Sequence, residues 1–324
     1  MRLRWLLLVV ALFVSAVAAL TFGTLDVGIT DAWRALFGSG DPTDVLVVQQ
    51  LRLPRVVLAA LLGAGLGISG AALQGVLRNP LAEPYLLGVS GGAAVGAVLA
   101  FSAGAAFALI PVAAFAGAAI AVTLALFVAH ATHGRGDPRV LVMAGVVVGA
   151  FANATIMIVM ANAEAGSARS ALWWMMGSAA DATWMHIAWL SGYLLLGGAL
   201  LVAHGRTLDA LSLGEDSAAG LGVDVDRAAR RVYLTSSLIA AATVAAAGLV
   251  GFVGLVVPHI ARRIGIGNSG HRVLLLASTL IGAVIVVLAD LAARVALPPA
   301  ELPLGAVTAV IGVPFFLMTL RRLA

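Results

Sequence analysis

The sequence contains no cysteine and no lysine, and all 19 basic residues among its 324 are arginine. Without cysteine the chain forms neither disulfides nor thiolate metal sites, and it has no thiol nucleophile. Without lysine it cannot build the phosphate-binding loop of P-loop ATPases, in which a lysine contacts the β- and γ-phosphates. Any ATP hydrolysis connected with this chain must therefore come from a partner.

Charged residues are also scarce. Only 10% of the chain is charged and 62% is hydrophobic, whereas a soluble domain carries about 25% charged residues. A soluble globule cannot bury so much apolar surface, so a bilayer is the natural solvent. The net charge of +4 comes from arginines scattered between apolar runs, not from the clustered basic face that nucleic acid requires. We therefore predict an all-α integral membrane protein that does not bind nucleic acid.

Apolar runs long enough to span a bilayer, about 20 residues each, recur along the whole chain. A shorter run, Phe252–Ile260, ends in Pro258-His259 and predicts a half-length or broken helix, which is tolerated only where protein or a cavity covers the backbone. No low-complexity linker interrupts the chain, so we predict a single domain, residues 1–324, with about ten transmembrane helices. The full-length candidates are Trp5–Phe22, Val56–Val76, Leu86–Phe107, Leu109–Ala131, Val140–Ala161, Ile187–Ala203, Val232–Val250, Val273–Leu291 and Leu304–Leu320.

The distribution of arginine indicates the orientation, because cytoplasmic segments carry an excess of basic residues. With ten alternating spans and both termini inside, 14 of the 19 arginines fall inside, and the opposite orientation inverts this ratio. We therefore predict that both termini are cytoplasmic. The arginines left outside are Arg34, Arg52, Arg55, Arg169 and Arg294.

The start of the chain has a second interpretation. Arg2 and Arg4, an apolar core and the small residues Ala16–Ala18 also fit a cleavable signal peptide. Its removal would leave the new N-terminus outside and the rest of the topology unchanged. The residues alone leave both interpretations open.

Three segments between the spans are long enough to hold structure. Residues 23–51, outside, contain Thr30–Arg34, which is typical of an N-capped amphipathic turn on the membrane surface. Residues 162–189, also outside, hold four tryptophans; indole rings favour the headgroup level, so we predict an interfacial helix here. Residues 208–231 form the longest inside loop and carry Glu215, Asp216, Asp224 and Asp226.

Two patterns suggest chemistry, but each lacks a necessary partner. Gly88–Gly92 matches the Gly-x-Ser-x-Gly pattern of serine hydrolases, with Ser90 as the nucleophile. All six histidines fall at span ends or in loops, so no base is expected at the depth of Ser90. His130 and His133 have a metal-like spacing, but only Asp137 stands near enough to join them. We expect no catalytic residue, no metal site and no cofactor bound by this chain.

Glycine and methionine recur in the predicted spans. Gly63 with Gly67, and Gly92 with Gly96, have the spacing that lets helix backbones approach closely, and packing within one bundle explains it more simply than a dimer interface. Methionines in and around the predicted spans are candidates for lining a pathway or ligating haem iron, although packing is the more frequent role of methionine. The pathway and gate candidates are Met143, Met157, Met160, Met175, Met176 and His186.

Charges gather at the predicted outside face. Arg52 and Arg55 open the second span, and Asp290 and Arg294 close the ninth. Charges near membrane depth are costly and most have a function. An Asp290–Arg294 pair at i,i+4 or contact with lipid headgroups explains them, and an electropositive rim that docks an acidic partner explains them equally well.

Six separated strings resemble one known family, in the family's order, over about residues 50–320. The family is FecCD, the permeases of type II ABC importers for vitamin B12, haem and ferric siderophores. The strings are Arg52–Arg55, Gly70–Gly92, Leu213–Val223, Gly248–Arg262, Ala289–Arg294 and Glu301–Thr308.

The resemblance implies a BtuC-like permease fold that forms a homodimer around a central pathway. It implies two cytoplasmic ABC ATPase subunits, which use ATP and Mg²⁺, and a periplasmic or lipid-anchored binding protein that delivers the substrate. It also implies that the first span is retained in a multi-pass protein of the cell inner membrane. Ser90 becomes a packing residue.

The resemblance also implies roles for residues. The binding protein would dock at Arg52, Arg55 and Arg294. The pathway would be lined mainly by Val140–Ala161, the outside segment that follows it and the last span. The inside loop, over Leu211–Val223, would form short coupling helices on the ATPase, with Leu213, Gly214, Glu215, Gly220 and Gly222 as the contact candidates.

The expected function is ATP-driven import, by alternating access, of an iron chelate (haem or a ferric siderophore) or of cobalamin, without enzymatic activity in this chain. Iron-containing cargo ranks ahead of cobalamin on family frequency alone. One alternative is an ATP-independent secondary transporter, although such proteins place ionisable groups near mid-span. The other is an intramembrane serine protease that uses Ser90.

Overall fold

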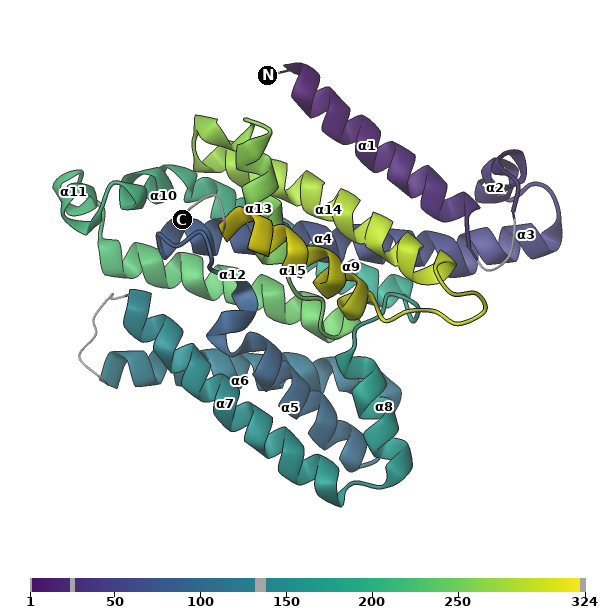
Figure 1. The fold of residues 1–324 in the computed structure, drawn as a ribbon, viewed down its shortest axis with the longest axis horizontal. Coiled ribbons are helices and arrows are strands. Elements are labelled where there is room, and N and C mark those ends of the chain that lie inside the picture. The colour runs from purple at the N-terminus through teal and green to yellow at the C-terminus, as the bar shows by residue number, and fades with distance from the viewer. Residues whose placement is uncertain (1, 24–26, 132–137, 321–324) are drawn as a thin grey trace.

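The computed structural model describes residues 2–23, 27–131 and 138–320, which fold almost entirely into helices (Figure 1). Each predicted span, and the predicted broken helix, coincides with a helix. The long helices are α1 (Arg2–Thr21), α4 (Leu53–Val76), α6 (Ile110–Ala131), α7 (Pro138–Asn162), α9 (Trp184–Ala203), α12 (Val225–Ala247) and α14 (His271–Val295). The shorter ones are α2 (Ile29–Leu36), α3 (Pro42–Leu46), α5 (Val89–Ser102), α8 (Ala165–Met175), α10 (Gly205–Ser212), α11 (Glu215–Gly220), α13 (Val253–Arg263) and α15 (Leu304–Leu320). A π-helical segment, η1 (Val47–Arg52), precedes α4, and the short 3₁₀ helices are η2 (Pro84–Leu87), η3 (Phe107–Leu109) and η4 (Gly267–Ser269).

Six helical segments of the described chain are long and apolar enough to cross a membrane. They are Arg2–Thr21, Pro42–Val76, Phe107–Ala131, Val140–Asn162, Trp184–Ala203 and His271–Val295. Of the remaining helices, α5 and α15 are apolar but shorter, α12 has charged residues in its first two turns, and α13 has 11 residues. Six of the ten predicted segments are therefore long and apolar enough to cross a membrane by themselves, and the other four are shorter or carry charged residues.

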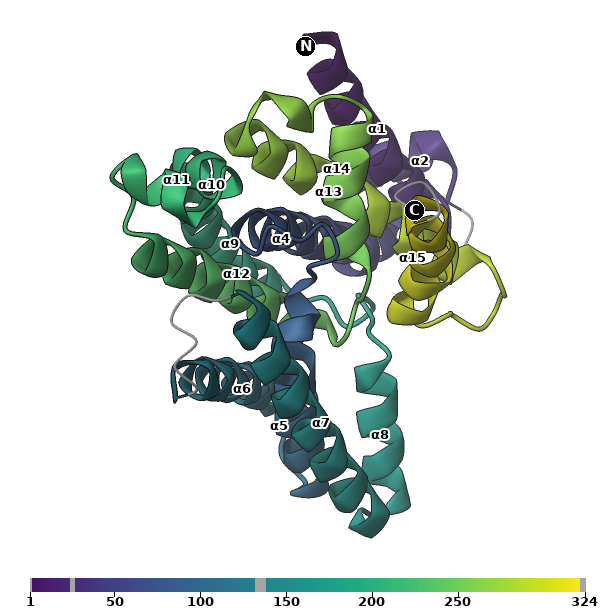
Figure 2. The ribbon, with the colours of Figure 1, turned by 60° about the vertical axis from the view of Figure 1, so that its left-hand side comes forward.

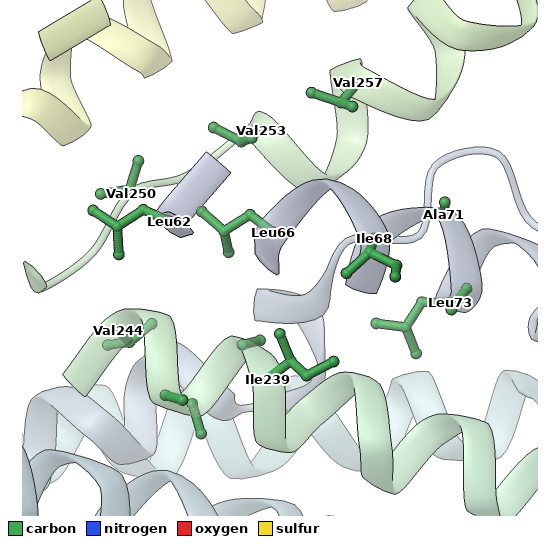
Figure 3. Packing of buried hydrophobic residues seen from close by; sticks show 14 of the residues in the cluster. Leu62, Leu66, Ile68, Ala71, Leu73, Ile239, Val244, Val250, Val253 and Val257 are labelled. Carbon is green, nitrogen blue, oxygen red and sulfur yellow. The ribbon is translucent and has the colours of Figure 1, made fainter. Parts of the chain in front are cut away.

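Helix α4 is the centre of the fold. Of its 24 residues, 20 are buried, and it packs against α14, α12, α13 and α9. The apolar core that it shares with α12 and α13 includes Leu62, Leu66, Ile239, Val253 and Val257 (Figure 3). A helix that is apolar on all sides is typical of a buried position in a membrane bundle.

Glycines allow the central helices to touch through their backbones. A Cβ atom on Gly63 would lie 2.0 Å from the carbonyl oxygen of Gly282 on α14, and one on Gly70 would lie 2.0 Å from that of Gly254 on α13. On α5, a Cβ atom on Gly96 would lie 2.1 Å from the carbonyl oxygen of Ala113 on α6. The glycine spacing noted in the sequence therefore serves helix packing within this chain.

Helices α5, α6, α7 and α8 form a second group beside α12 (Figures 1 and 2). Helix α5 lies among the other three, and α6 joins the group to α12. Helix α1 packs along α14 at the opposite edge.

The two ends of the bundle carry different short helices (Figure 1). At one end, α2 buries Ala32 and Ala35 against Val47 and Val48, whereas Trp33 is exposed. The predicted amphipathic turn is thus a helix, but it begins at Ile29 after Gly28, which provides no side-chain cap. The predicted interfacial helix is α8, and the other end of the bundle carries α10 and α11.

Candidate functional site

Arg55, in the first turn of α4, is the centre of a buried charge cluster. Its Nε donates to both carboxylate oxygens of Asp290 on α14, at 2.9 and 3.1 Å. Its Nη1 donates to both oxygens of Glu301, at 2.9 and 3.1 Å. Arg55 is only 9% exposed, so two carboxylates from distant parts of the chain compensate its charge inside the protein.

Two further arginines tie the same region to α1. Asp290 comes one turn before Arg294 on α14, and its carboxylate lies 3.2 Å from the Arg294 guanidinium group. Arg294 also donates a hydrogen bond to the carbonyl oxygen of Ala19. Arg52 donates to the carbonyl oxygens of Leu20 and Thr21 at 2.7 and 2.6 Å. The last carbonyls of a helix have no partner within the helix and carry partial negative charge, so the two guanidinium groups stabilise the end of α1.

These contacts change the interpretation of the outside arginines. The sequence suggested an exposed electropositive rim, but Arg52, Arg55 and Arg294 are buried by α1, α14 and the loop before α15. The i,i+4 pair of Asp290 and Arg294, the alternative explanation, is present. The docking role of the three arginines is not tested by these contacts and stays a prediction.

The segment between α12 and α13 is a break in the helical bundle. Helix α12 ends at Ala247 and is followed by Gly248, with φ +72°, and α13 begins after Phe252, with φ +66°. The carboxylate of Glu83 accepts a hydrogen bond from Phe252 N–H at 2.6 Å, and the hydroxyl oxygen of Tyr85 accepts one from Val250 N–H at 3.1 Å. Two side chains of the α4–α5 connection therefore satisfy backbone groups that the broken helix leaves free.

Burial determines the electrostatics of Glu83. It raises the pKa of the carboxyl group, and the hydrogen bond from Phe252 N–H offsets this only in part. The place of the Glu83 carboxylate at the start of α13 acts in the opposite direction and favours the charged form, because the first N–H groups of a helix carry partial positive charge. No role for Glu83 or Tyr85 follows from the sequence, although both lie in the string Gly70–Gly92.

A backbone junction joins α8, the broken segment and α15. Leu304 N–H donates to Gly177 O and Gly305 N–H to Met176 O, each at 3.0 Å. A Cβ atom on Gly305 would lie 2.3 Å from the carbonyl oxygen of Leu249, and one on Gly248 would lie 2.1 Å from that of Trp174. The start of α15 is thus fixed to both the end of α8 and the broken segment.

The predicted pathway residues do not form one cluster. Met143 and Met157 are exposed on α7, at 68% and 73%; they stand fourteen positions apart and so share nearly one helix face. Met160 and Met175 instead pack together with α5, and Met176 belongs to the junction with α15. His186, in the first turn of α9, makes an edge contact with Trp189 at 6.2 Å between ring centroids. Their pathway role is untested.

The coupling candidates lie on α10, α11 and the turns around them. Leu213 is 67% exposed between the two helices, and Glu215 forms an ion pair with Arg78 at the end of α4. Gly214 and Gly222 have φ values of +108° and +81°, which favour glycine, and Gly220 has open space around its Cβ position. The helical character predicted for this loop is confirmed, with α10 beginning earlier than expected, at Gly205.

Asp209 of α10 contacts His271 in two ways. Its carboxylate accepts a hydrogen bond from the backbone N–H of His271 at 2.8 Å and lies 2.7 Å from Nδ1 of the same residue. Because His271 begins α14, this contact fixes α10 to the helix that carries Asp290 and Arg294 at its other end.

No group of three metal-ligating side chains occurs within the described residues, and His133 and Asp137 lie outside them. The Ser90 hydroxyl contacts the carbonyl oxygen of Tyr85 at 3.5 Å, and no hydrogen bond of the described residues joins it to a histidine.

Comparison with known proteins gives consistent results. The model of the FecCD transport family matches residues 7–322. The chain is 41% identical to the cobalamin import permease BtuC of Halobacterium salinarum, over 90% of this chain and 78% of that protein. It is 39% identical to the Fe(3+)-citrate import permease YfmE of Bacillus subtilis, over 98% and 94% of the two chains. A solved structure, described as an inward-facing conformation of a metal-chelate type ABC transporter, superposes with a TM-score of 0.85 at 28% identity and 97% coverage of both chains.

Proposed function

Because the chain belongs to the FecCD transport family and is a permease subunit of an ABC importer, we propose that it imports a bulky metal chelate across the inner membrane. The main support is that the match to permeases of this class extends over nearly the whole chain, in sequence and in fold. An iron chelate, haem or a ferric siderophore, is the first choice of cargo, and cobalamin is the second. Relatives that import ferric citrate and cobalamin are almost equally similar to this chain.

We propose that two copies of the chain form the pathway between them. Support comes from α7 and α15, on which large apolar side chains are exposed in the isolated chain. In a homodimer these surfaces would face the second copy or the cargo, with Met143 and Met157 among the residues nearest to it. The exposed apolar residues are Met143, Val146, Val147, Phe151, Met157 and Ile158 on α7, and Val310, Ile311, Val313, Leu317 and Met318 on α15.

Energy would come from two ABC ATPase subunits that use ATP and Mg²⁺ and bind α10 and α11. The absence of lysine supports a separate ATPase, because the chain has no residue for a P-loop. Leu213 and Leu221 are 67% and 66% exposed at this end of the bundle, as expected of residues that a partner covers. In this arrangement both termini are cytoplasmic.

A substrate-binding protein would deliver the cargo at the opposite end, where Arg52, Arg55 and Arg294 lie. Since all three are buried, an acidic side chain of the binding protein reaches Arg55 only if Glu301 moves away. Glu301 is the accessible member of the cluster, with a side chain 37% exposed. Docking would therefore exchange one carboxylate for another.

The test of cargo and class is uptake in a strain that lacks the gene and carries it on a plasmid. Labelled haem, a ferric siderophore and cobalamin are offered separately, with and without depletion of ATP. Gene-dependent and ATP-dependent uptake of one of them identifies the cargo. Uptake that continues without ATP would contradict the importer mechanism, and gene-independent uptake of all three would contradict the cargo assignment.

A further inference from the structure

A cleft of about 890 Å³ lies between α12 and α6. It is at the end of the bundle that carries α10 and α11. Its volume lies within the range of ligand sites, about 300–1,000 Å³. The first turns of α12, the last two turns of α6 and the end of α4 form its walls, with contributions from α7, α10 and α11. Leu211 and Glu215 belong to the proposed ATPase-coupling region, whereas the walls formed by α12 and α6 have no role in the function proposed above.

The lining changes from charged to apolar along α12. Asp226 and Arg230 are exposed in the first two turns, whereas Tyr233 is 1% exposed and Leu234 is half-buried. On the other wall, Leu126 of α6 faces the same space. A site that is charged at one side and apolar at the other fits an amphiphile whose headgroup lies at the charges and whose chains lie along the helices.

Most of the charges that line the cleft already have partners. Three arginines and three carboxylates contribute to the lining. Arg78 pairs with Glu215, and Arg227 lies 3.4 Å from Asp224.

Arg230 and Asp226 are left without an ion pair among the described residues. They stand at i and i+4 on one helix, so their Cβ atoms are about 5–6 Å apart. The cleft therefore presents one positive and one negative group side by side, which suits a zwitterion better than an anion.

A second, independent feature points to a ligand. The hydroxyl of Tyr233 is buried and has no hydrogen-bond partner within the described part of the chain. Tyr233 lines the cleft one turn further along α12 than Arg230. A buried hydroxyl without a partner is unfavourable, and an ester carbonyl just below a lipid headgroup is an acceptor of the required kind.

We propose that this cleft binds one phospholipid with an amine headgroup, of the phosphatidylethanolamine type. Arg230 binds the phosphate, Asp226 binds the ammonium, and the acyl chains lie between α6 and α12. Charged residues at the ends of spans lie at headgroup level, and charged pockets between spans at the cytoplasmic side are known to bind headgroups. The site holds this end of α12 against α6 and does not depend on the cargo.

Native mass spectrometry of the purified, delipidated full chain tests the proposal. Phosphatidylethanolamine, phosphatidylcholine and phosphatidylglycerol are added separately. The wild type is expected to retain phosphatidylethanolamine preferentially, because phosphatidylcholine has no N–H to donate to Asp226 and phosphatidylglycerol has no cation. Arg230→Gln and Asp226→Asn should each weaken binding about tenfold, the loss of one charge-assisted hydrogen bond, and Tyr233→Phe should weaken it less.

Two control variants make the same charge changes outside the cleft. Arg231→Gln follows Arg230 on α12, and Asp216→Asn lies on α11; both residues are exposed and neither lines the cleft. Lipid retention should be unchanged in both. An equal loss of lipid retention in control and cleft variants would overturn the proposal, and so would equal binding of the three lipids by the wild type. So would weaker binding of the ATPase by Arg230→Gln with lipid retention unchanged, because the cleft would then belong to that interface.

Discussion

Arg55 and Glu301, 246 positions apart in the sequence, are joined by two hydrogen bonds from one guanidinium nitrogen. Glu301 lies in the loop that leads directly into α15, and Leu302 N–H of the same loop donates to Ala293 O on α14. The contact therefore connects the start of α4 with the start of a helix proposed to line the pathway. If an acidic partner replaces Glu301 at Arg55, as proposed, the loop loses this contact, and docking would be coupled to the position of α15 through one arginine.

This coupling predicts that Glu301→Gln strengthens docking. Loss of the charge weakens the internal competitor for Arg55, so the binding protein should bind the purified transporter several-fold more tightly. Surface plasmon resonance measures the dissociation constant. Glu164→Gln, at the exposed start of α8, removes a carboxylate from another loop of the same predicted face and should leave affinity unchanged. Unchanged or weaker binding by Glu301→Gln would refute the competition, whereas absence of binding by the wild type would refute the docking proposal itself.

Asp290→Asn should destabilise the protein strongly. Asp290 is 1% exposed and compensates both Arg55 and Arg294. Removal of one member of a buried ion pair costs about 3–5 kcal/mol, so the melting temperature in detergent should fall by several degrees or more. Asp31→Asn breaks an exposed pair with Arg34, 3.9 Å apart, and should change little. A wild-type melting temperature in Asp290→Asn would show that the cluster does not stabilise the fold.

The sequence predicted the helices better than the contacts between them. The apolar runs of α4 and α14 exceed the length of a span and contain few charges, so their existence follows from composition. The i,i+4 pair of Asp290 and Arg294 follows from helix periodicity. The contacts of Glu83 with Phe252 and of Arg55 with Glu301 join residues 169 and 246 positions apart, and no local pattern encodes such separations.

The burial of the arginines also depended on tertiary structure. The sequence placed Arg55 at the start of one helix and Arg294 at the end of another, as the structure does. It did not reveal that the end of α1 supplies carbonyl acceptors to Arg52 and Arg294. An arginine at a span end has the same sequence context whether it faces solvent or a neighbouring helix. Likewise, the sequence grouped the methionines as one set of pathway candidates, but Met143 and Met157 are exposed on α7 whereas Met160 packs with α5.

Glu83→Ala should loosen the broken segment, whereas Glu83→Gln should largely preserve it. The glutamine amide oxygen can still accept the hydrogen bond from Phe252 N–H, whereas alanine leaves a buried donor unsatisfied at a cost of about 1–3 kcal/mol. Hydrogen exchange at residues 250–254, followed by mass spectrometry, measures the effect. Faster exchange in both variants alike would mean that the negative charge, not the acceptor, holds α13.

Gly305→Ala should disrupt the junction of α8, the broken segment and α15. The added methyl group would lie 2.3 Å from Leu249 O and 2.5 Å from Met176 O, both backbone atoms that cannot rotate away. Overpacking of this kind costs about 1–3 kcal/mol, and we expect a lower melting temperature together with reduced uptake. Gly251→Ala changes a glycine of the same broken segment that has no atom within 4 Å of its Cβ position, and it should resemble the wild type. Normal stability and uptake in Gly305→Ala would exclude a rigid junction here.

Leu213→Ser should uncouple the permease from its ATPase without unfolding it. Leu213 is 67% exposed between α10 and α11, so it contributes little to the core, yet the proposed interface would bury it. Loss of a buried leucine contact is worth about 1.5–3 kcal/mol, which corresponds to roughly a tenfold or greater loss of ATPase affinity. Co-purification of the ATPase and transport-coupled ATP hydrolysis are the measurements, with Ile264→Ser as the control, because Ile264 follows α13 and is 40% exposed. If both variants bind the ATPase like the wild type, α10 and α11 are not the coupling surface; if both lose it, the interface extends to the end of α13.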